Sequence, residues 1–478
     1  MDREFSSLPL STALLSVVAG LGFEQMTPIQ EASIPALLAG KDLVGQSKTG
    51  SGKTAAFALP ILQRLTLETR ALKALILCPT RELSAQVARE LRKLGRNLPG
   101  LQVLVLAGGE PLRPQANALE RGVHVVVGTP GRVLDHLRRE ILDLRETETI
   151  VLDEADRMLD MGFEEDMEQI LEAMPRSRQT VFFSATFPPS IAEMSDRYQQ
   201  DPVRVTIAAE AEDQALMRQL LLTVEPEEKL AALRRVLAHY PHESALIFAN
   251  FKASVAQLEK ALGNGGMSVA SIHGDLEQFE RDRVMAKFRN ASTRVLVATD
   301  VAARGIDIEN LDLVINYDLP VTPAVYTHRI GRTGRAGKEG LTIAFAGARE
   351  QHKIQAIEHH TRAPFERIKL SDMTERVQAE GIVEAEENVS EPPPPLAREA
   401  KMDTLRIAGG RKQKMRPGDI LGALTGEAGG LSGTDIGKIE IHDNFSYVAV
   451  AKSVSRRAQQ SLSNGKIKGK KFVVALIK

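Results

Sequence analysis

The chain has 478 residues, which is more than a single hydrophobic core usually supports, so we expect two or three domains. Apolar residues make up 43% and charged residues 26%, the proportions of an ordinary soluble globular protein. The formal net charge of −1 argues against a uniformly basic nucleic-acid binder, and the single cysteine, Cys78, excludes an intramolecular disulfide and a zinc site made of cysteines.

The N-terminal sequence, MDREFSSLPL, is charged and lacks the long apolar core of a signal peptide. No uninterrupted apolar run in the chain is long enough to span a bilayer. A single cysteine also favours a reducing compartment. These features predict a cytoplasmic protein that has no membrane partner.

Through the first three-quarters of the chain, short apolar runs rich in Val, Ile and Leu alternate with longer amphipathic stretches. Such runs are typical of strands buried on both faces of a parallel sheet. The first series consists of Asp42–Gln46, Ala74–Cys78, Val103–Leu106, His124–Gly128, Thr149–Leu152 and Thr180–Phe183. The second consists of Gln219–Val224, Ala245–Phe248, Val269–Ile272, Arg294–Ala298, Leu313–Asn316 and Thr342–Phe345. We therefore predict two consecutive α/β domains, residues 1–207 and 218–370, joined near Thr206–Met217.

A phosphate-binding loop is predicted directly after the first strand, where residues 47–54 are SKTGSGKT. Its glycines let backbone N–H groups approach phosphate oxygens, Lys53 reaches the β and γ oxygens, and the Thr54 hydroxyl faces Mg²⁺. The alternative is a glycine-rich turn that only opens a helix. The residues predicted to bind ATP here are Ser47, Lys48, Thr49, Gly50, Ser51, Gly52, Lys53 and Thr54.

An acidic pair, Asp153 and Glu154, follows the strand Thr149–Leu152, in the sequence Asp-Glu-Ala-Asp. At the carboxyl end of a strand downstream of a phosphate loop, Asp153 would hold Mg²⁺, largely through water, and Glu154 would orient and deprotonate the attacking water. A helix N-cap is the alternative, but it accounts for only one of the carboxylates.

An acidic, proline-containing linker is predicted at residues 371–400. Residues 371–399 contain 2 Lys/Arg and 8 Asp/Glu, and Pro392–Pro395 form a proline run. Beyond it, residues 402–478 contain 14 Lys/Arg and 6 Asp/Glu, so the domain at 401–478 is basic. This charge favours a polyanion partner, or alternatively a surface kept basic for solubility.

The C-terminal domain is expected to have the order β-α-β-β-α-β, which RNA-recognition folds share with many domains that do not bind RNA. The expected elements are Thr404–Ile407, Arg416–Leu424, Ile436–Ile441, Tyr447–Val450, Val454–Leu462 and Phe472–Ile477. Tyr447 is the one convincing stacking aromatic. We therefore expect recognition through shape and through two basic loops more than through stacked bases. The basic residues of these loops are Arg411, Lys412, Lys414, Arg416, Lys466, Lys468, Lys470 and Lys471.

The phosphate loop and the Asp-Glu-Ala-Asp sequence together resemble those of the DEAD-box RNA helicases. The family's other motifs are matched, in order, by Gly22-Phe23 with Thr27-Pro28-Ile29-Gln30, Pro79-Thr80-Arg81-Glu82-Leu83, Gly108-Gly109, Thr129-Pro130-Gly131-Arg132, Ser184-Ala185-Thr186, Phe248-Ala249-Asn250, His273-Gly274, Gln278 with Arg281, Thr299-Asp300, Arg304-Gly305-Ile306-Asp307 and His328-Arg329-Ile330-Gly331-Arg332-Thr333-Gly334-Arg335. The resemblance implies two tandem RecA-like parallel-sheet lobes and an RRM-like α+β domain. A departure from the pattern is Ser47, where the family usually has alanine.

Carried over motif by motif, the resemblance implies roles for individual residues. ATP would also contact Phe5, Phe23, Thr27, Gln30, Gly305 and Asp307. The catalytic groups would be Lys53, Asp153, Glu154, His328 and the arginine fingers Arg332 and Arg335, with Mg²⁺ at Thr54 and Asp153. RNA would contact Pro79, Thr80, Arg81, Gly109, Thr129, Pro130, Arg132, Asn250, Gly274, Arg281, Thr299 and Asp300, besides Arg411, Lys412, Lys414, Arg416, Lys466 and Lys468. Asp156, Ser184, Thr186 and Arg304 would couple hydrolysis to strand separation.

The C-terminal sequence resembles the terminal domain of the bacterial DbpA helicases, particularly at Gly409–Gly426, Ile436–Ile439 and Gly465–Lys470. That resemblance implies an RNA-dependent ATPase and helicase that binds 23S ribosomal RNA and acts on precursors of the large (50S) ribosomal subunit. We expect a monomer. The alternatives are an ATP-dependent RNA clamp that unwinds little, a motor for DNA or protein remodelling, and a general cold-response or RNA-decay helicase.

Overall fold

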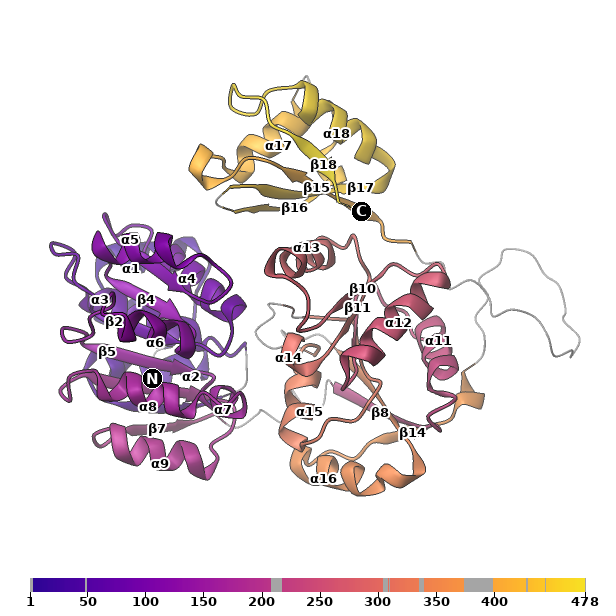
Figure 1. The fold of residues 1–478 in the computed structure, drawn as a ribbon, viewed down its shortest axis with the longest axis horizontal. Helices are drawn as coiled ribbons and strands as arrows, with labels where there is room; N and C mark the ends of the chain where they lie inside the picture. Colours follow the sequence, from indigo (N-terminus) through magenta and orange to yellow (C-terminus); the bar gives the residue numbers. More distant parts are fainter. Residues whose placement is uncertain are drawn as a thin grey trace, which may run out of the picture. The chain divides into compact units, whose positions relative to one another are not determined.

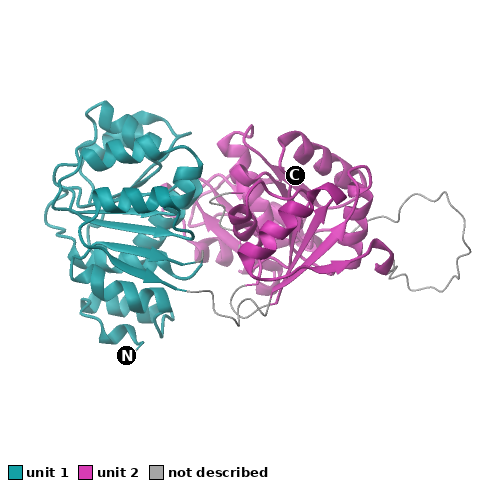
Figure 2. Ribbon diagram, turned by 90° about the horizontal axis from the view of Figure 1, so that it is seen from below, with its two compact units in different colours: residues 1–214, 304–307 teal, residues 215–303, 308–478 magenta. Residues whose placement is uncertain are grey.

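The computed structural model describes residues 3–47, 50–207, 217–303, 308, 310–334, 339–373, 399–426, 429–442 and 444–477. These residues form two compact units, coloured separately in Figure 2; the first contains the described residues up to 207 and the second those from 217 onward. No helix among them is long and apolar enough to cross a membrane.

The first unit is a seven-stranded parallel sheet of order β3-β4-β2-β5-β6-β1-β7 with helices on both faces (Figure 1). Its strands are β1 (Leu43–Gln46), β2 (Ala74–Leu77), β3 (Val103–Leu106), β4 (Val125–Gly128), β5 (Thr149–Asp153), β6 (Gln179–Ser184) and β7 (Val203–Thr206). Its helices are η1 (Phe5–Ser7), α1 (Thr12–Gly20), α2 (Pro28–Leu38), α3 (Lys53–Arg64), α4 (Arg81–Leu94), α5 (Leu112–Glu120), α6 (Pro130–Arg138), α7 (Ala155–Asp160), α8 (Glu164–Glu172) and α9 (Pro189–Tyr198).

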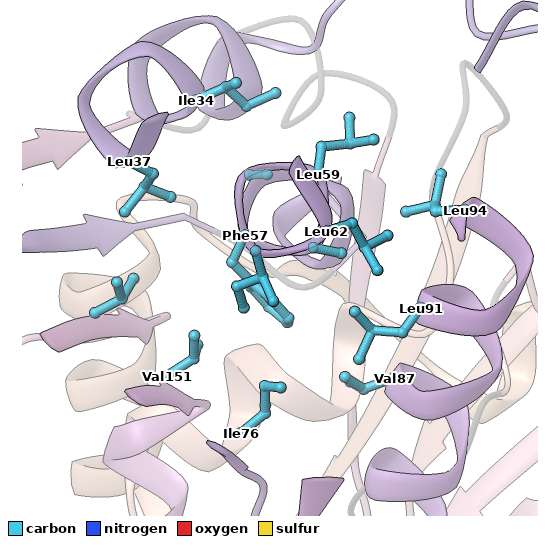
Figure 3. Close-up of a cluster of buried hydrophobic side chains, with 14 of the residues drawn as sticks. Ile34, Leu37, Phe57, Leu59, Leu62, Ile76, Val87, Leu91, Leu94 and Val151 are labelled. Atoms are coloured by element: carbon cyan, nitrogen blue, oxygen red, sulfur yellow. The ribbon is translucent and has the colours of Figure 1, made fainter. Parts of the chain in front are cut away.

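Two hydrophobic cores lie on opposite faces of this sheet. Successive side chains of a strand point to opposite faces, so Val151 packs in one core while Ile150 and Leu152 pack in the other. Figure 3 shows the first core, where Phe57 of α3 lies between the strands and Leu91 of α4. Because both faces are covered by helices, the central strands are almost completely buried, which explains their continuous apolar sequences.

The second unit begins with another seven-stranded parallel sheet, of order β10-β11-β9-β12-β13-β8-β14. Its strands are β8 (Met217–Thr223), β9 (Ala245–Phe248), β10 (Val269–Ile272), β11 (Val295–Ala298), β12 (Leu313–Asn316), β13 (Gly340–Ala346) and β14 (Glu366–Ile368). Its helices are α11 (Lys229–His239), α12 (Lys252–Asn264), α13 (Gln278–Arg289), α14 (Asp300–Ala303), α15 (Pro323–Ile330), η2 (Ala348–Glu350), α16 (Gln351–Thr361) and η3 (Leu370–Asp372).

A four-stranded antiparallel sheet of order β16-β17-β15-β18 completes the second unit. Its strands are β15 (Met402–Ile407), β16 (Ile436–Ile441), β17 (Ser446–Ala451) and β18 (Val474–Leu476). The helical segments are η4 (Arg411–Gln413), α17 (Pro417–Thr425), η5 (Gly433–Asp435), η6 (Lys452–Val454) and α18 (Ser455–Asn464). Side chains of α17 and α18 pack with those of β15 and β17 in one core on a single face of this sheet.

The predicted fold class is confirmed: two RecA-like parallel sheets are followed by a small RRM-like α+β domain. The sequence did not predict β7 and β14, the last strand at one edge of each large sheet. Both are short and partly exposed, so neither has the continuous apolar run that identified the buried strands.

Replacing Phe57 by Ala tests the first core. Phe57 is 1% exposed and its ring centroid lies 5.8 Å from that of Phe183, so its removal leaves a cavity that the sheet cannot fill. We expect the free energy of opening of amides in β2 and β5, measured by native-state hydrogen exchange, to fall by about 3 kcal/mol. Phe251, which is 69% exposed, is the matched control. An equal loss of protection in the first sheet on Phe251→Ala would contradict this assignment of the core.

Candidate functional site

The polar residues singled out in the first unit follow the carboxyl ends of its strands. The loop with Ser47 follows β1, Pro79 and Thr80 follow β2, and Thr129 follows β4. Asp153 is the last residue of β5, and Ser184 is the last residue of β6. Because all these strands are parallel, their carboxyl ends lie along one side of the sheet, which we call the carboxyl edge. Ligands of open α/β sheets usually bind there.

The ammonium group of Lys53, the first residue of α3, contacts the residue that directly follows β1. The Lys53 Nζ donates a hydrogen bond to the Ser47 carbonyl at 3.0 Å, and the Ser47 and Ser51 hydroxyls are 2.8 Å apart. Gly52, the N-cap of α3, has a φ of +93°, a conformation that favours glycine. A buried lysine beside the N–H groups that open a twelve-residue helix is an arrangement suited to phosphate. Lys48 and Thr49 lie outside the described residues.

Two hydrogen bonds tie the start of α2 to this loop, and a third closes the start of the helix on itself. Gln30 Oε1 accepts from the backbone N–H of Thr27 at 2.9 Å, and Gln30 Nε2 donates to the Gly52 carbonyl at 3.1 Å. The Thr27 hydroxyl donates to the Ser51 carbonyl at 2.8 Å. The rings of Phe5 and Phe23, which are also predicted to contact ATP, pack against each other with their centroids 6.2 Å apart. The hydrogen bonds to Ser51 and Gly52 hold the end of the loop against the segment predicted to contact adenine.

Asp153 has the electrostatics of a cation ligand. It is 3% exposed, and its Oδ1 has no hydrogen-bond partner among the described residues. Burial raises the pKa of Asp153 to about 7, against the opposing charge of Lys53. A buried carboxylate oxygen without a partner, beside a helix that begins Lys53-Thr54, fits Mg²⁺, which needs only one or two protein ligands when phosphate and water supply the rest.

Glu154 is held by an arginine that the sequence interpretation did not single out. Glu154 has a φ of +56°, which is uncommon for a residue with a side chain, and it precedes α7. Arg157 Nη1 donates to Glu154 Oε2 at 2.7 Å, and both side chains are almost fully buried. Arg157 directly follows the Asp-Glu-Ala-Asp sequence. The sequence alone does not indicate that its side chain pairs with Glu154, because most arginines on helices lie at the surface.

A direct link joins the ends of β5 and β6. Asp156 Oδ2 accepts from the Thr186 backbone N–H at 2.8 Å and from the Thr186 hydroxyl at 2.7 Å. The Asp156 backbone N–H donates to the Ser184 hydroxyl at 3.3 Å. The structure thus brings together three residues that the family resemblance named as coupling residues.

The residues predicted to bind RNA in the first unit lie on neighbouring loops of the same edge. Thr80 caps α4 by accepting from the Leu83 N–H at 3.3 Å, and Thr129 precedes α6, which begins with Pro130. Arg132 Nη1 donates to Gln115 Oε1 at 2.8 Å and to the Glu110 carbonyl at 3.1 Å. The guanidinium of Arg81 lies against Gly108 and Gly109, so a Cβ at Gly109 would collide with it. Gln115 is a buried polar residue that the sequence interpretation missed.

Arg329 organises the corresponding residues of the second unit. It is 1% exposed and bonds through Nε and Nη2 to both carboxylate oxygens of Asp300, at 2.6 and 2.7 Å. It also donates to Asn250 Oδ1 at 2.8 Å, to Asn316 Oδ1 at 3.0 Å and to the Asp318 carbonyl at 2.6 Å. Two predicted RNA-binding residues, Asn250 and Asp300, are therefore positioned by one buried cation that had no predicted role.

The other predicted residues of the second unit lie on several elements. Arg281 lies on α13 and donates to the Ala302 carbonyl at 3.3 Å, while Thr299 precedes α14 and Gly274 follows β10. His328 lies on α15, and Arg332 is buried just after that helix. Arg304, Gly305, Asp307 and Arg335 lie outside the described residues.

The two basic loops of the C-terminal domain meet. The Lys468 ammonium donates to the Lys414 carbonyl at 2.9 Å and lies 3.7 Å from Asp419. Lys466 and Lys468 also line an open hollow against the glycines of α17. Arg411, Lys412 and Arg416 are exposed on the other loop. The expected stacking residue, by contrast, does not reach the surface: Tyr447 is fully buried, so its identification as a base-stacking aromatic was wrong for this arrangement of the domain.

Three family models match the chain. A model for DEAD/DEAH box helicases matches residues 27–194, and one for the helicase conserved C-terminal domain matches residues 228–337. A model for the DbpA RNA binding domain matches residues 404–476. The matches fall on the first parallel sheet, on most of the second, and on the small antiparallel sheet, respectively.

Individual relatives agree with these matches. The chain is 45% identical over 475 residues to the ATP-dependent RNA helicase DbpA of Escherichia coli (strain K12), covering 99% of both chains. It is 42% identical over 382 residues to the DEAD-box ATP-dependent RNA helicase CshA of Bacillus cereus (strain ATCC 10987 / NRS 248), covering 80% of this chain and 73% of that one. Among solved structures, it is similar to S. cerevisiae Dbp5 bound to RNA and ADP BeF3, with a TM-score of 0.70 and 31% identity, covering 77% of this chain and 96% of that one.

Replacing Arg329 by Met tests the network in the second unit. The change leaves the Asp300 carboxylate and the acceptors of Asn250 and Asn316 without their shared donor, and removing one partner of a buried pair is costly. We expect a loss of about 3 kcal/mol in the opening free energy of amides in β9 and β12, measured by hydrogen exchange. Arg349→Met, at an exposed position, should change it by less than about 0.5 kcal/mol. Equal protection in the two variants would show that the network is not stabilising.

Proposed function

The chain belongs to the DEAD-box ATP-dependent RNA helicases, and from that premise we propose that its RNA target is 23S ribosomal RNA, on which it acts during assembly of the large ribosomal subunit. The observation that supports this most is the match of residues 404–476 to the DbpA RNA binding domain, in a chain that aligns with E. coli DbpA over almost its whole length. The meeting of the two basic loops gives that domain a cationic surface for phosphate. RNA and precursors of the 50S subunit would be its partners.

In the first unit, different residues would bind the phosphates, the adenine and the Mg²⁺ of ATP. Lys53 and the N–H groups at the start of α3 would bind the phosphates, and Gln30 with Phe5 and Phe23 would hold the adenine. Asp153, largely through water, and Thr54 would hold Mg²⁺, which neutralises phosphate charge when bound. Glu154 would orient and deprotonate the attacking water, for which its carboxylate must face the γ-phosphate rather than remain engaged by Arg157 alone.

Hydrolysis would depend on the second lobe because it supplies Arg332 and Arg335 as arginine fingers, with His328 coupling them to the acidic residues. RNA contacts through both lobes would favour the closed arrangement, local strand separation would follow, and hydrolysis would release the RNA. The two hydrogen bonds that Thr186 donates to the Asp156 carboxylate would link the nucleotide site to the RNA-binding residues.

The remaining assignments follow the same proposal. The first lobe would occupy residues 1–207, the second 218–370, the linker 371–400 and the RNA-binding domain 401–478. The protein would act as a monomer in the cytoplasm, where its ribosomal substrate is assembled.

Substitution of the two central ATP-site residues should separate binding from hydrolysis. Lys53→Ala removes the cation that faces the phosphates and should reduce RNA-stimulated ATP turnover at least a thousandfold, equivalent to about 4 kcal/mol. Glu154→Gln should abolish turnover yet trap the RNA complex, seen as slowed RNA dissociation in the presence of ATP. Normal hydrolysis by Glu154→Gln would exclude Glu154 as the general base.

The RNA target is tested by ATPase rates with a 23S fragment containing the peptidyl-transferase-centre hairpin and with generic single-stranded RNA. We expect the fragment to stimulate the full chain at a far lower concentration. Lys412→Glu combined with Lys466→Glu should remove that preference but keep stimulation by generic RNA, because both side chains are exposed and distant in sequence from the ATP site. Arg349→Glu is the matched control. Equal stimulation of the unchanged protein by both RNAs would leave the helicase intact as a general RNA helicase and refute the 23S assignment.

A strand-displacement assay separates the helicase from an RNA clamp that hydrolyses ATP without unwinding. Release of a short duplex strand that requires ATP supports the helicase, whereas tight ATP-dependent RNA binding without release supports the clamp.

A further inference from the structure

A buried glutamine lies behind one of the predicted RNA contacts of the first unit. Gln115 on α5 is 3% exposed, and its side-chain amide reaches two other elements. Its Nε2 donates to the carbonyl of Ala107, which directly follows β3, at 3.1 Å, and its Oε1 accepts from Nη1 of Arg132 on α6 at 2.8 Å. A buried amide is costly unless its hydrogen bonds are made, so these two bonds hold the side chain in place.

The orientation of the Gln115 amide follows from these two neighbours. A carbonyl oxygen only accepts and a guanidinium only donates, so Nε2 must face Ala107 and Oε1 must face Arg132. The reverse orientation would place two acceptors together and two donors together. The backbone at the end of β3 therefore determines which atom Arg132 meets.

A second donor reaches the same oxygen from α6. His136 lies one helical turn after Arg132, so both side chains are on one face of the helix. His136 is fully buried, and its Nε2 lies 3.0 Å from Gln115 Oε1. Because that oxygen can only accept, Nε2 must be the ring nitrogen that carries the proton.

The rest of the imidazole fits a neutral ring. The Nδ1 atom of His136 has no hydrogen-bond partner among the described residues, so a second N–H there would be buried without an acceptor. Burial, and then the charge of Arg132, lower the pKa of His136. His136 therefore donates through Nε2 without placing a second positive charge beside the guanidinium.

The guanidinium of Arg132 is held through only one of its nitrogens. Nη1 donates to Gln115 Oε1 and also to the Glu110 carbonyl, at 3.1 Å. In the part of the chain that the structure describes, the side-chain hydrogen bonds of Arg132 all use Nη1, and the side chain is partly exposed. Nε and Nη2 remain as a pair of donors, which matches two oxygens of a phosphate.

The same amide also holds a second predicted RNA contact. Ala107, which accepts from Gln115, directly precedes Gly108-Gly109, and Glu110, which accepts from Arg132, directly follows them. Loss of the amide would release Arg132 and also one end of the segment that contains Gly109.

We propose that Gln115 is a positioning residue for RNA: its amide, oriented by the Ala107 carbonyl and supported by His136, directs the guanidinium of Arg132 so that Nε and Nη2 meet a phosphate of the bound strand. This inference rests on the proposed function, because the orientation of Arg132 matters only if Arg132 contacts RNA. Gln115 is buried and would not touch the RNA itself. Phosphate contacts carry no base information, so the effect would be the same for any single-stranded RNA.

A double-mutant cycle in the full chain tests the link between Gln115 and Arg132. The measured quantity is the concentration of generic single-stranded RNA that gives half-maximal ATPase stimulation. We expect Arg132→Met to raise it about tenfold and Gln115→Met about fivefold, because the first removes and the second misdirects a charge-assisted contact. In the double variant, Gln115→Met should add less than about twofold to the effect of Arg132→Met.

Two outcomes of the cycle would overturn the inference in different ways. Effects that multiply in the double variant would show that Gln115 acts independently of Arg132, while the RNA contact of Arg132 would stand. An unchanged RNA concentration in Arg132→Met would show that Arg132 does not contact RNA, and its proposed RNA-binding role would fail together with the inference.

Gln199→Met is the matched control for the loss of a buried amide. Gln199 is 8% exposed and donates to the carbonyls of Leu43 and Thr180, near the amino ends of β1 and β6 and so away from the carboxyl edge. We expect this variant to lower the hydrogen-exchange protection of the first sheet but to keep the half-maximal RNA concentration within about twofold of the unchanged protein. An equal rise in that concentration for Gln199→Met and Gln115→Met would show that lost stability explains the effect, and would refute the positioning role.

The salt dependence of RNA binding gives a readout that a loss of stability would not change. Each phosphate contact on a single strand contributes about 0.7 to the slope of log Kd against log salt concentration. We expect Arg132→Met and Gln115→Met each to lower the slope by about that amount. A lowered slope in Arg132→Met with an unchanged slope in Gln115→Met would contradict the proposal.

The part played by His136 is tested by two substitutions. His136→Gln keeps an N–H donor near the position of Nε2, whereas His136→Phe keeps the ring volume without a donor. We expect His136→Phe to raise the half-maximal RNA concentration about threefold and His136→Gln to restore most of that loss. Equal values for the two variants would show that the donor of His136 does not support the amide, and would remove His136 from the proposal.

Discussion

The parallel direction of the strands in the first sheet is the constraint on which the arrangement of the site depends. Parallel strands all end on the same side of the sheet. Ser47, Thr80 and Asp153, which are far apart in the sequence, therefore lie on the same side of the sheet. Hydrophobic cores on both faces of the sheet bury the strands that lead to these ends. Burial there raises the pKa of the Asp153 carboxyl group, and the neighbouring charge of Lys53 opposes that rise.

Hydrogen bonds connect this edge to the parts of the enzyme that must respond to the nucleotide. Thr27 and Gln30 join the phosphate loop to α2, and Asp156 joins the end of β5 to Thr186 after β6. Each of these hydrogen bonds is partly buried, so water competes with it little. In the second unit, Arg329 plays the same positioning part for Asn250 and Asp300.

The sequence alone predicted those features that a local pattern of residues determines. Buried strands were recognisable because their apolar runs are continuous, and the phosphate loop and acidic pair because their chemistry requires fixed spacing. The edge strands β7 and β14 have no such run. Arg157, Arg329 and Gln115 were missed because an arginine or glutamine on a helix usually lies at the surface, and only tertiary packing shows that these are buried. Tyr447 was misassigned because only tertiary packing shows that its ring is fully buried, in contact with the rings of His442 and Phe445.

The central claim, that the nucleotide and RNA sites are coupled, is tested most directly by reciprocal binding. The affinity of a non-hydrolysable ATP analogue with Mg²⁺ is measured with and without saturating RNA, and the affinity of RNA with and without the analogue. The account predicts that each ligand tightens the other by the same factor, of roughly ten or more, and that Thr186→Ala reduces both factors together. Affinities that do not depend on the other ligand would contradict it.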